Sequence, residues 1–124
     1  MKANELMLED WVLYENTPKR ILEIREEECL ISISPNAYRL VHIDELFPIA
    51  ITPEILNKNG FVFHDFVFGD YWECYGLHIY GGNYADGHSN WNINCGTNVS
   101  MNVTYIHQLQ HAFKLCGIED EIQL

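Results

Sequence analysis

The sequence lacks the features that define several common classes of protein. No apolar run approaches the length of a membrane-spanning helix, and the opening residues, MKANELMLEDW, hold no apolar segment typical of a secretory signal peptide. The four cysteines lie far apart and form no C-x-x-C pair that would suggest a zinc or redox site: Cys29, Cys74, Cys95 and Cys116. These absences predict a cytoplasmic protein with reduced, mostly buried thiols.

Basic residues are also scarce. The chain has 7 lysines and arginines against 18 aspartates and glutamates, and from Phe61 onward only Lys114 is basic. Nucleic acids and anionic membranes are bound largely by neutralising phosphates, so this balance disfavours both. A protein partner or self-association is compatible with the acidity.

Aromatic residues, in contrast, are abundant. They make up 13% of the 124 residues, which favours β structure, a binding surface, or both. The length suits a single domain, 1–124, in which 1–50 and 51–124 can form two lobes. The predicted fold class is α+β.

Short segments of alternating polarity indicate that residues 1–50 form a strand-rich lobe. Four strands are predicted: 11–14, 20–25, 29–33 and 38–43. A turn is predicted at 15–18. Short strands at such close spacing are typical of a small curled antiparallel sheet or an SH3-like barrel.

A short helix is predicted next, because its ends carry residues that helix ends favour. Thr52 can act as the N-cap, and Pro53 suits the first helical position. Gly60 suits the left-handed conformation that ends many helices, and Phe61 can then fold back onto Leu56.

Antiparallel aromatic hairpins are predicted to follow. Strands 61–68 and 71–80 are expected to be joined by a two-residue turn at Gly69-Asp70, with Gly76 forming a bulge. Within the second strand, Leu77 and Ile79 should point to one face of the sheet and His78 and Tyr80 to the other. The expected remainder of this region is a loop at 81–90 and strands at 91–95 and 99–101.

The last predicted element is a helix over 104–116 that packs across the sheet. Its apolar residues share one face: Tyr105, Ile106, Leu109, Ala112, Phe113 and Cys116. His107 and His111 fall on the opposite side, so both imidazoles are expected to face solvent.

Three segments carry a family resemblance: the MKANEL start followed by Trp11-Val12, the segment PIAITPEIL at 48–56 continued by NGF at 59–61, and YIHQLQ at 105–110. Together they resemble a family of small uncharacterised proteins of gut anaerobes and their prophages or other mobile elements. Relatives often carry Asn where this chain has His111, so a two-histidine site would be peculiar to this protein. The family has no assigned activity, and the resemblance implies a context without a mechanism.

Two groups of residues are candidate binding sites. Loops on a rigid sheet often carry contacts, and one such loop with the strand after it holds Tyr84, Asp86, His88 and Trp91. The second group is His107 and His111, whose spacing could chelate a metal with a third ligand such as His78, His88 or Asp86. No glutamate lies between the two histidines as in metalloproteases, so no metal or other cofactor is predicted.

The sequence assigns no catalytic residue, because it contains no nucleophile-elbow or phosphate-binding motif. The leading hypothesis is a non-enzymatic protein-interaction module encoded by a prophage or mobile element. Two alternatives stay open: an acidic nucleic-acid mimic that occupies a basic groove on a protein, and a small hydrolase that depends on histidine and acidic residues.

Overall fold

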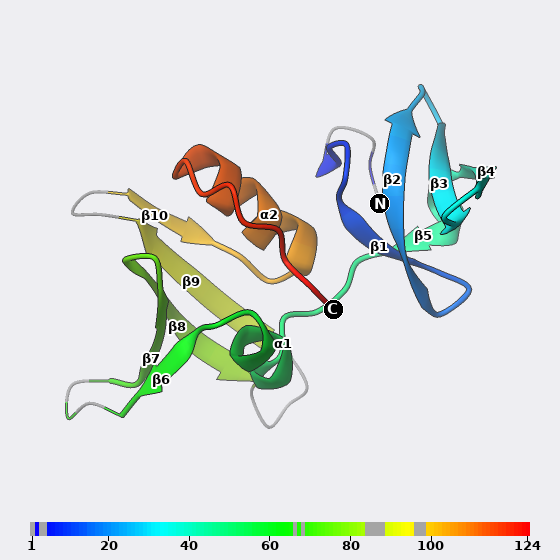
Figure 1. Cartoon of the computed structure of the whole chain (residues 1–124). Coiled ribbons are helices and arrows are strands. Elements are labelled where there is room, and N and C mark those ends of the chain that lie inside the picture. The colour runs from blue at the N-terminus through cyan, green and yellow to red at the C-terminus, as the bar shows by residue number, and fades with distance from the viewer. Residues whose placement is uncertain (1, 3–4, 66, 68, 84–88, 96–98) are drawn as a thin grey trace. The chain divides into compact units, whose positions relative to one another are not determined.

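The fold was obtained as a computed structural model, which describes residues 2, 5–65, 67, 69–83, 89–95 and 99–124 (Figure 1). It confirms the α+β class, with two five-stranded antiparallel sheets, one short helix and a C-terminal helix. The chain divides into two compact units, Met1–Ile49 and Ala50–Leu124, termed the N-terminal and C-terminal units. The prediction that the two units form a single domain, 1–124, remains untested.

The N-terminal unit is an antiparallel sheet whose first four strands form a meander and whose fifth strand returns to pair with the first. Its elements are β1 (Trp11–Tyr14), β2 (Thr17–Ile24), β3 (Glu28–Ser34), β4 (Ala37–His42), the 3-10 turn η2 (Ile43–Glu45) and β5 (Leu46–Phe47). The strand order is β4-β3-β2-β1-β5, and no closed barrel is detected among the residues described in this unit. The register of β2 against β3 shifts between Ile21 and Glu23, an irregularity that bends the strand.

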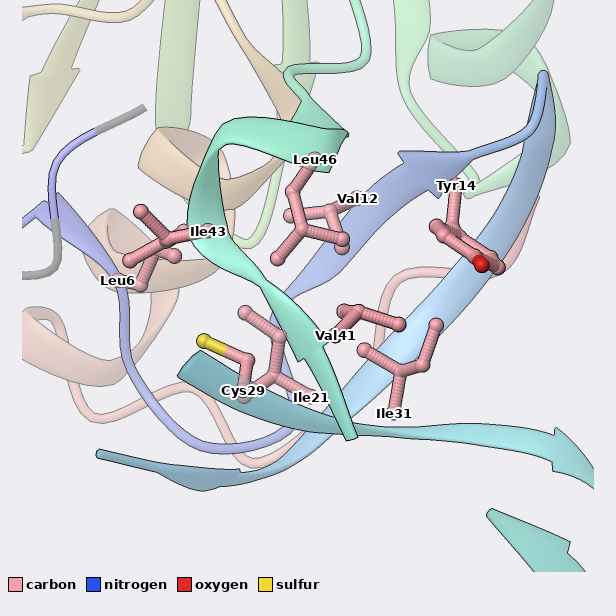
Figure 2. Close-up of a cluster of buried hydrophobic side chains, with 9 residues drawn as sticks. All are labelled: Leu6, Val12, Tyr14, Ile21, Cys29, Ile31, Val41, Ile43 and Leu46. Atoms are coloured by element: carbon pink, nitrogen blue, oxygen red, sulfur yellow. The ribbon is translucent and has the colours of Figure 1, made fainter. Parts of the chain in front are cut away.

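The core of the N-terminal unit is one cluster of apolar side chains (Figure 2). Its members are Leu6, Val12, Tyr14, Ile21, Cys29, Ile31, Val41, Ile43 and Leu46. In β1 every second residue is buried, and β3 begins with the same alternation, as expected for strands with one face toward a core. The cluster therefore consists of side chains from this unit's own strands and from the segments that flank them.

The turn between β1 and β2 is tighter than the predicted turn over 15–18. It consists of Glu15 and Asn16, whose φ angles are 50° and 61°. Positive φ at both central residues is the signature of a type I′ turn, which matches the twist of the flanking strands. Pro18 lies inside β2, before the pairing with β3 begins at Ile21. The prediction that Thr17 and Pro18 belong to the turn is therefore wrong.

The C-terminal unit combines the second sheet with two helices. Its elements are α1 (Pro53–Lys58), β6 (Val62–His64), β7 (Tyr71–Cys74), β8 (Leu77–Asn83), β9 (Ser89–Cys95), β10 (Val99–Asn102) and α2 (Ile106–Leu115). The strands form a meander in the order β10-β9-β8-β7-β6. Strands β8 and β9 occupy both ends of the segment 81–90, so the predicted loop there is too long.

The tight turn of the aromatic hairpins lies at Tyr75-Gly76 and not at Gly69-Asp70. Tyr75 and Gly76 have φ angles of 54° and 77°, and Cys74 pairs with Leu77 across them. Glycine adopts positive φ at little steric cost, so Gly76 serves the turn and the predicted bulge is wrong. Strand β6 is correspondingly shorter than the predicted strand.

Helix α1 begins and ends as predicted. The Thr52 side chain accepts a hydrogen bond from the Ile55 N–H at 3.3 Å. Gly60 has a φ of 83°, and the Phe61 N–H donates to the Leu56 carbonyl at 3.0 Å. The local chemistry of the helix ends was therefore sufficient to place this element.

Helix α2 covers one face of the C-terminal sheet, and Figure 1 shows it beside β9 and β10. The Phe113 ring lies 6.0 Å from the ring of Phe61 and 6.4 Å from that of Tyr75. Buried side chains of the sheet are Leu77, Ile79, Trp91 and Ile93. Among the described residues, no helix has both the length and the apolar character needed to cross a membrane.

The last residues of the chain are anchored on the end of α1. The Asn59 side chain donates to the Gln123 carbonyl at 2.7 Å and accepts from the Gln123 N–H at 2.6 Å. The Lys58 ammonium donates to the Leu124 carbonyl, and Ile122 is buried. The C-terminal segment thus belongs to the core of its unit.

Candidate functional sites

The loop that was predicted as a recognition surface is only partly described. Tyr84, Asp86 and His88 lie outside the described residues, so binding by them stays a prediction. Trp91 is 1% exposed and belongs to the interior of the unit. Its Nε1–H has no hydrogen-bond partner in the described structure.

His107 is buried, so the prediction that both histidines of α2 face solvent is wrong. Its exposed fraction is 3%, whereas His111 is half-buried. Tyr105 precedes α2 and stacks on His107, with ring centroids 5.9 Å apart and planes 8° apart. The His111 ring lies edge-on at 5.8 Å. A helical wheel scores histidine as polar, but a neutral imidazole can pack as a flat aromatic ring.

A groove lies between α2 and the edge strand β10, and is termed the β10–α2 groove. Its volume is about 350 Å³, within the range of small-ligand pockets. It is lined by Met101, Asn102, Val103, Gln108, His111 and Ala112. His111, a predicted binding residue, is therefore at a concave surface.

Hydrogen bonds at the start of α2 connect the two walls of this groove. The Gln108 side-chain oxygen accepts from the Thr104 N–H at 2.7 Å and from the Tyr105 N–H at 3.1 Å. The Val103 N–H donates to the Trp91 carbonyl at 2.7 Å. Because strand and helix are fixed through the same short connection, the groove is pre-organised for a ligand.

Strand β10 is the last strand of its sheet. Among the described strands it pairs only with β9. The outer edge of such a strand presents backbone N–H and C=O groups to another strand. The edge and the groove therefore lie side by side on one flank of the unit.

The second candidate site is the sheet face that points away from α2, termed the polar face. Leu77 and Ile79 are buried, and His78 and Tyr80 point to the opposite side, as predicted. The strand registers place nine described residues on this face. Seven form its centre, namely His64, Tyr71, Glu73, His78, Tyr80, Asn92 and Asn94, and the exposed Val62 and Asn102 flank them on the outer strands β6 and β10. The face is open, since the side chains of Glu73 and His78 are 39% and 37% exposed.

The polar face consists of two rows that run across the strands. At the centre of the face, one row holds His64, Tyr71, Tyr80 and Asn92, and the other holds Glu73, His78 and Asn94. Asn102 continues the first row on β10, and Val62 continues the second on β6. Neighbours within a row are one strand spacing apart, about 4.8 Å.

Contacts among these side chains fix their positions. The Tyr71 ring stacks on His64 with centroids 4.8 Å apart and on His78 with centroids 4.7 Å apart. The Glu73 carboxylate lies 3.2 Å from His64 Nε2 and 3.9 Å from His78 Nε2. His78 Nδ1 is 3.3 Å from the Tyr80 hydroxyl. The cluster is therefore connected by stacking and polar contacts.

The polar face does not fit a single metal ion. The ring of Tyr71 stacks against both His64 and His78, and the Nε2 atoms of both histidines point toward the Glu73 carboxylate. Within the part of the chain that the structure describes, no group of three or more His, Cys, Asp or Glu side chains could hold a metal.

A pair of carboxyl groups borders the polar face. Asp65 follows His64, and Asp70 precedes Tyr71. A side-chain hydrogen bond with Asp70, and next the Asp70 charge, raise the pKa of Asp65. The neighbouring carboxylate therefore favours the protonated form of Asp65.

The cysteines differ in state. Cys29 and Cys74 are free, but Cys116 is disulfide-bonded, so the expectation of reduced thiols fails for it. Burial raises the pKa of the Cys29 thiol; burial, followed by the charges of Asp120 and Glu73, raises that of Cys74. Both free thiols are therefore weak nucleophiles at neutral pH.

Comparison with protein-family models, curated proteins and solved structures finds no match for this chain. The sites are therefore interpreted from their own geometry.

Reasoning from the sequence found only part of these sites. It found His111, and it placed His78 and Tyr80 on the outer face of the sheet. It missed Tyr71 and Glu73, because the misplaced turn at Gly69-Asp70 left β7 without its register against β8. The available signal was the dipeptide Tyr75-Gly76, because glycine is favoured at the second central position of a two-residue hairpin turn.

Proposed function

We propose that this chain is a non-enzymatic protein-interaction module that binds an extended peptide in the β10–α2 groove. The observation that carries the proposal is an edge strand that runs beside a groove shared with a helix. In this arrangement a peptide can add to the sheet as a further strand. Main-chain hydrogen bonds then provide affinity, and every second side chain enters the groove and provides specificity.

The lining of the groove predicts the pattern of the bound segment. Met101, Val103 and Ala112 favour an apolar side chain, and Gln108 and His111 add polar contacts at the helix wall. From Phe61 onward the chain has only one basic residue, which favours a partner rich in lysine or arginine. The expected ligand is therefore an extended, cationic segment with an apolar anchor.

The N-terminal unit is proposed to be an SH3-like module. Support comes from the meander of β1 to β4, from the return of β5 to pair with β1, and from the 3-10 turn η2 directly before β5. The resemblance to proteins of gut anaerobes and mobile elements remains the proposed origin. The nucleic-acid mimic and the small hydrolase that depends on histidine and acidic residues stay predictions.

The test selects peptides from a random 12-residue library against the intact chain and maps the best binder by NMR. We expect shifts in the amide signals of β10 and α2. His111→Ala should weaken binding about tenfold, or about 1.4 kcal/mol, because it removes part of the groove wall. His78→Ala, the matched change on the polar face, should leave the affinity unchanged.

Two outcomes would contradict the proposal. One is a selection that yields no peptide for the natively folded chain. The other is a binder whose amide shifts lie outside β10 and α2 and whose affinity is insensitive to His111→Ala.

A further inference from the structure

We infer that the polar face binds a neutral, linear oligosaccharide laid across the strands of the C-terminal sheet. This site is separate from the β10–α2 groove and does not depend on peptide binding. The inference rests on the chemistry of the seven side chains, on their spacing and on the contacts that hold them in place.

The polar face has the hydrogen-bonding groups that a neutral sugar requires. Only Glu73 among the seven residues has a carboxylate; the others carry hydroxyl, imidazole or amide groups. A sugar hydroxyl both donates and accepts, and so do the side chains of Asn92, Asn94 and Tyr80. A carboxylate such as Glu73 accepts from up to two neighbouring hydroxyls. The face therefore matches the hydroxyl pattern of a sugar ring, with Glu73 as its one carboxylate.

The two rows also have the spacing of a linear glycan. Side chains on adjacent strands recur at about 4.8 Å, comparable to the length of one sugar ring in a linear chain. At the centre of the face, the longer row extends over four strands, from His64 to Asn92. A chain of four sugars laid over both rows would place each ring above one strand.

Stacking within the cluster determines which part of each ring a ligand meets. Rings that stack on one another across neighbouring strands, as Tyr71 does with His64 and His78, cannot lie flat on the sheet. They present their edges to solvent, and the edges carry the hydroxyl and nitrogen atoms. Because these contacts already restrict the rotamers, binding orders few side chains and loses little entropy.

Other classes of ligand fit the polar face less well. Nucleic acid requires positive charge, but none of the seven residues is lysine or arginine. A protein partner needs large apolar anchors at the centre of its interface, and the aliphatic side chain that the register places on the described face, Val62, lies on the edge strand β6. A single metal ion does not fit for the reason given above.

The experiment titrates the intact chain with four linear tetrasaccharides and follows the backbone amides by NMR. The probes are β-1,4-linked glucose, α-1,4-linked glucose, β-1,4-linked mannose and β-1,4-linked N-acetylglucosamine. We expect at least one to bind with a Kd between about 10 μM and 1 mM, typical of a small open site. The shifted amides should lie in β7, β8 and β9.

Variants then separate recognition from folding. The double change Asn92→Ala and Asn94→Ala should weaken binding at least about fivefold, and Tyr80→Phe should weaken it less, because one hydroxyl is lost and the ring is kept. Asn57→Ala, the matched change at an exposed position of α1, should have no effect. All three proteins should retain the amide spectrum of the native fold.

The inference is overturned if none of the four tetrasaccharides binds at about 10 mM while the spectrum remains native. It is also overturned if a tetralysine peptide, and no sugar, shifts the amides of the polar face. Neither result would bear on peptide binding in the β10–α2 groove, which is measured with separate probes and with His111→Ala.

Discussion

The two sheets of this chain are both five-stranded and antiparallel, but β5 returns to pair with β1 in the N-terminal sheet, whereas the C-terminal sheet is a plain meander. The two sheets also complete their cores differently. The N-terminal sheet packs its inward side chains against one another and against the segments that flank its strands (Figure 2). The C-terminal sheet covers one face with α2. Such a cover has two consequences: a groove where the helix meets the edge strand, and a second face left open to solvent. Both proposed sites follow from the helical cover.

The largest expected effect comes from core substitutions that break one unit at a time. Phe113→Ala should destabilise the C-terminal unit by about 3–5 kcal/mol, because it leaves a cavity between α2, Phe61 and Tyr75. Ile31→Ala should destabilise the N-terminal unit by about 2–5 kcal/mol. Hydrogen–deuterium exchange, read separately over residues 1–49 and 50–124, should accelerate mainly in the substituted unit.

Equal acceleration of both units by either substitution would contradict this comparison. It would show that the two sheets unfold as one cooperative structure, as the single-domain prediction requires.

A smaller effect on stability is expected at the two type I′ turns. The N-terminal unit forms its turn from Glu15 and Asn16, and the C-terminal unit forms its turn from Tyr75 and Gly76. Gly76→Ala should destabilise the chain by about 1–2 kcal/mol, because a Cβ is disfavoured at a φ of 77°. Asn16→Gly, at a φ of 61°, should be neutral or slightly stabilising. Urea unfolding midpoints measure both. A Gly76→Ala protein as stable as the parent would show that the β7–β8 turn differs from the one described.

The smallest expected effect on stability comes from charged carboxyl groups. In the N-terminal unit, carboxylates meet arginines, as in the 3.2 Å contact of Glu9 with Arg20, whereas at the polar face Asp65 meets Asp70. The raised pKa of Asp65 means that the folded chain holds this proton more tightly than the unfolded chain. The resulting stabilisation is present at low pH and is lost as the pH rises from the ordinary aspartate pKa through the raised one.

Carbon-13 NMR titration of the side-chain carboxyls tests this expectation directly. In the parent protein Asp65 should titrate above the ordinary aspartate range. Asp70→Asn should lower the Asp65 pKa, because the repelling charge is removed. An Asp65 pKa that does not respond to Asp70→Asn would contradict the described pair.

Local chemistry was enough to predict some elements and not others. Thr52 and Gly60 determine the ends of α1 through contacts within a few residues, so the sequence places that helix correctly. The two-residue strand β5 has no periodicity to detect, because its pairing with β1 depends on residues far apart in the chain. Such non-local pairing is visible only in the folded chain.

The candidate sites were harder to predict, because each depends on register or burial. A choice between Gly69-Asp70 and Tyr75-Gly76 as the hairpin turn decides which residue faces His78, and both dipeptides carry a turn signal. The burial of His107 depends on stacking with Tyr105, which polarity along a helix does not encode. His111 was a candidate from the sequence, but the groove that it lines also depends on β10.

The buried indole of Trp91 has an optical consequence. Its N–H has no acceptor among the described residues, and its ring is shielded from water. An indole in such surroundings emits near the short-wavelength limit of tryptophan fluorescence. The C-terminal unit therefore carries a native chromophore whose emission should move toward the red when water reaches the interface beneath α2.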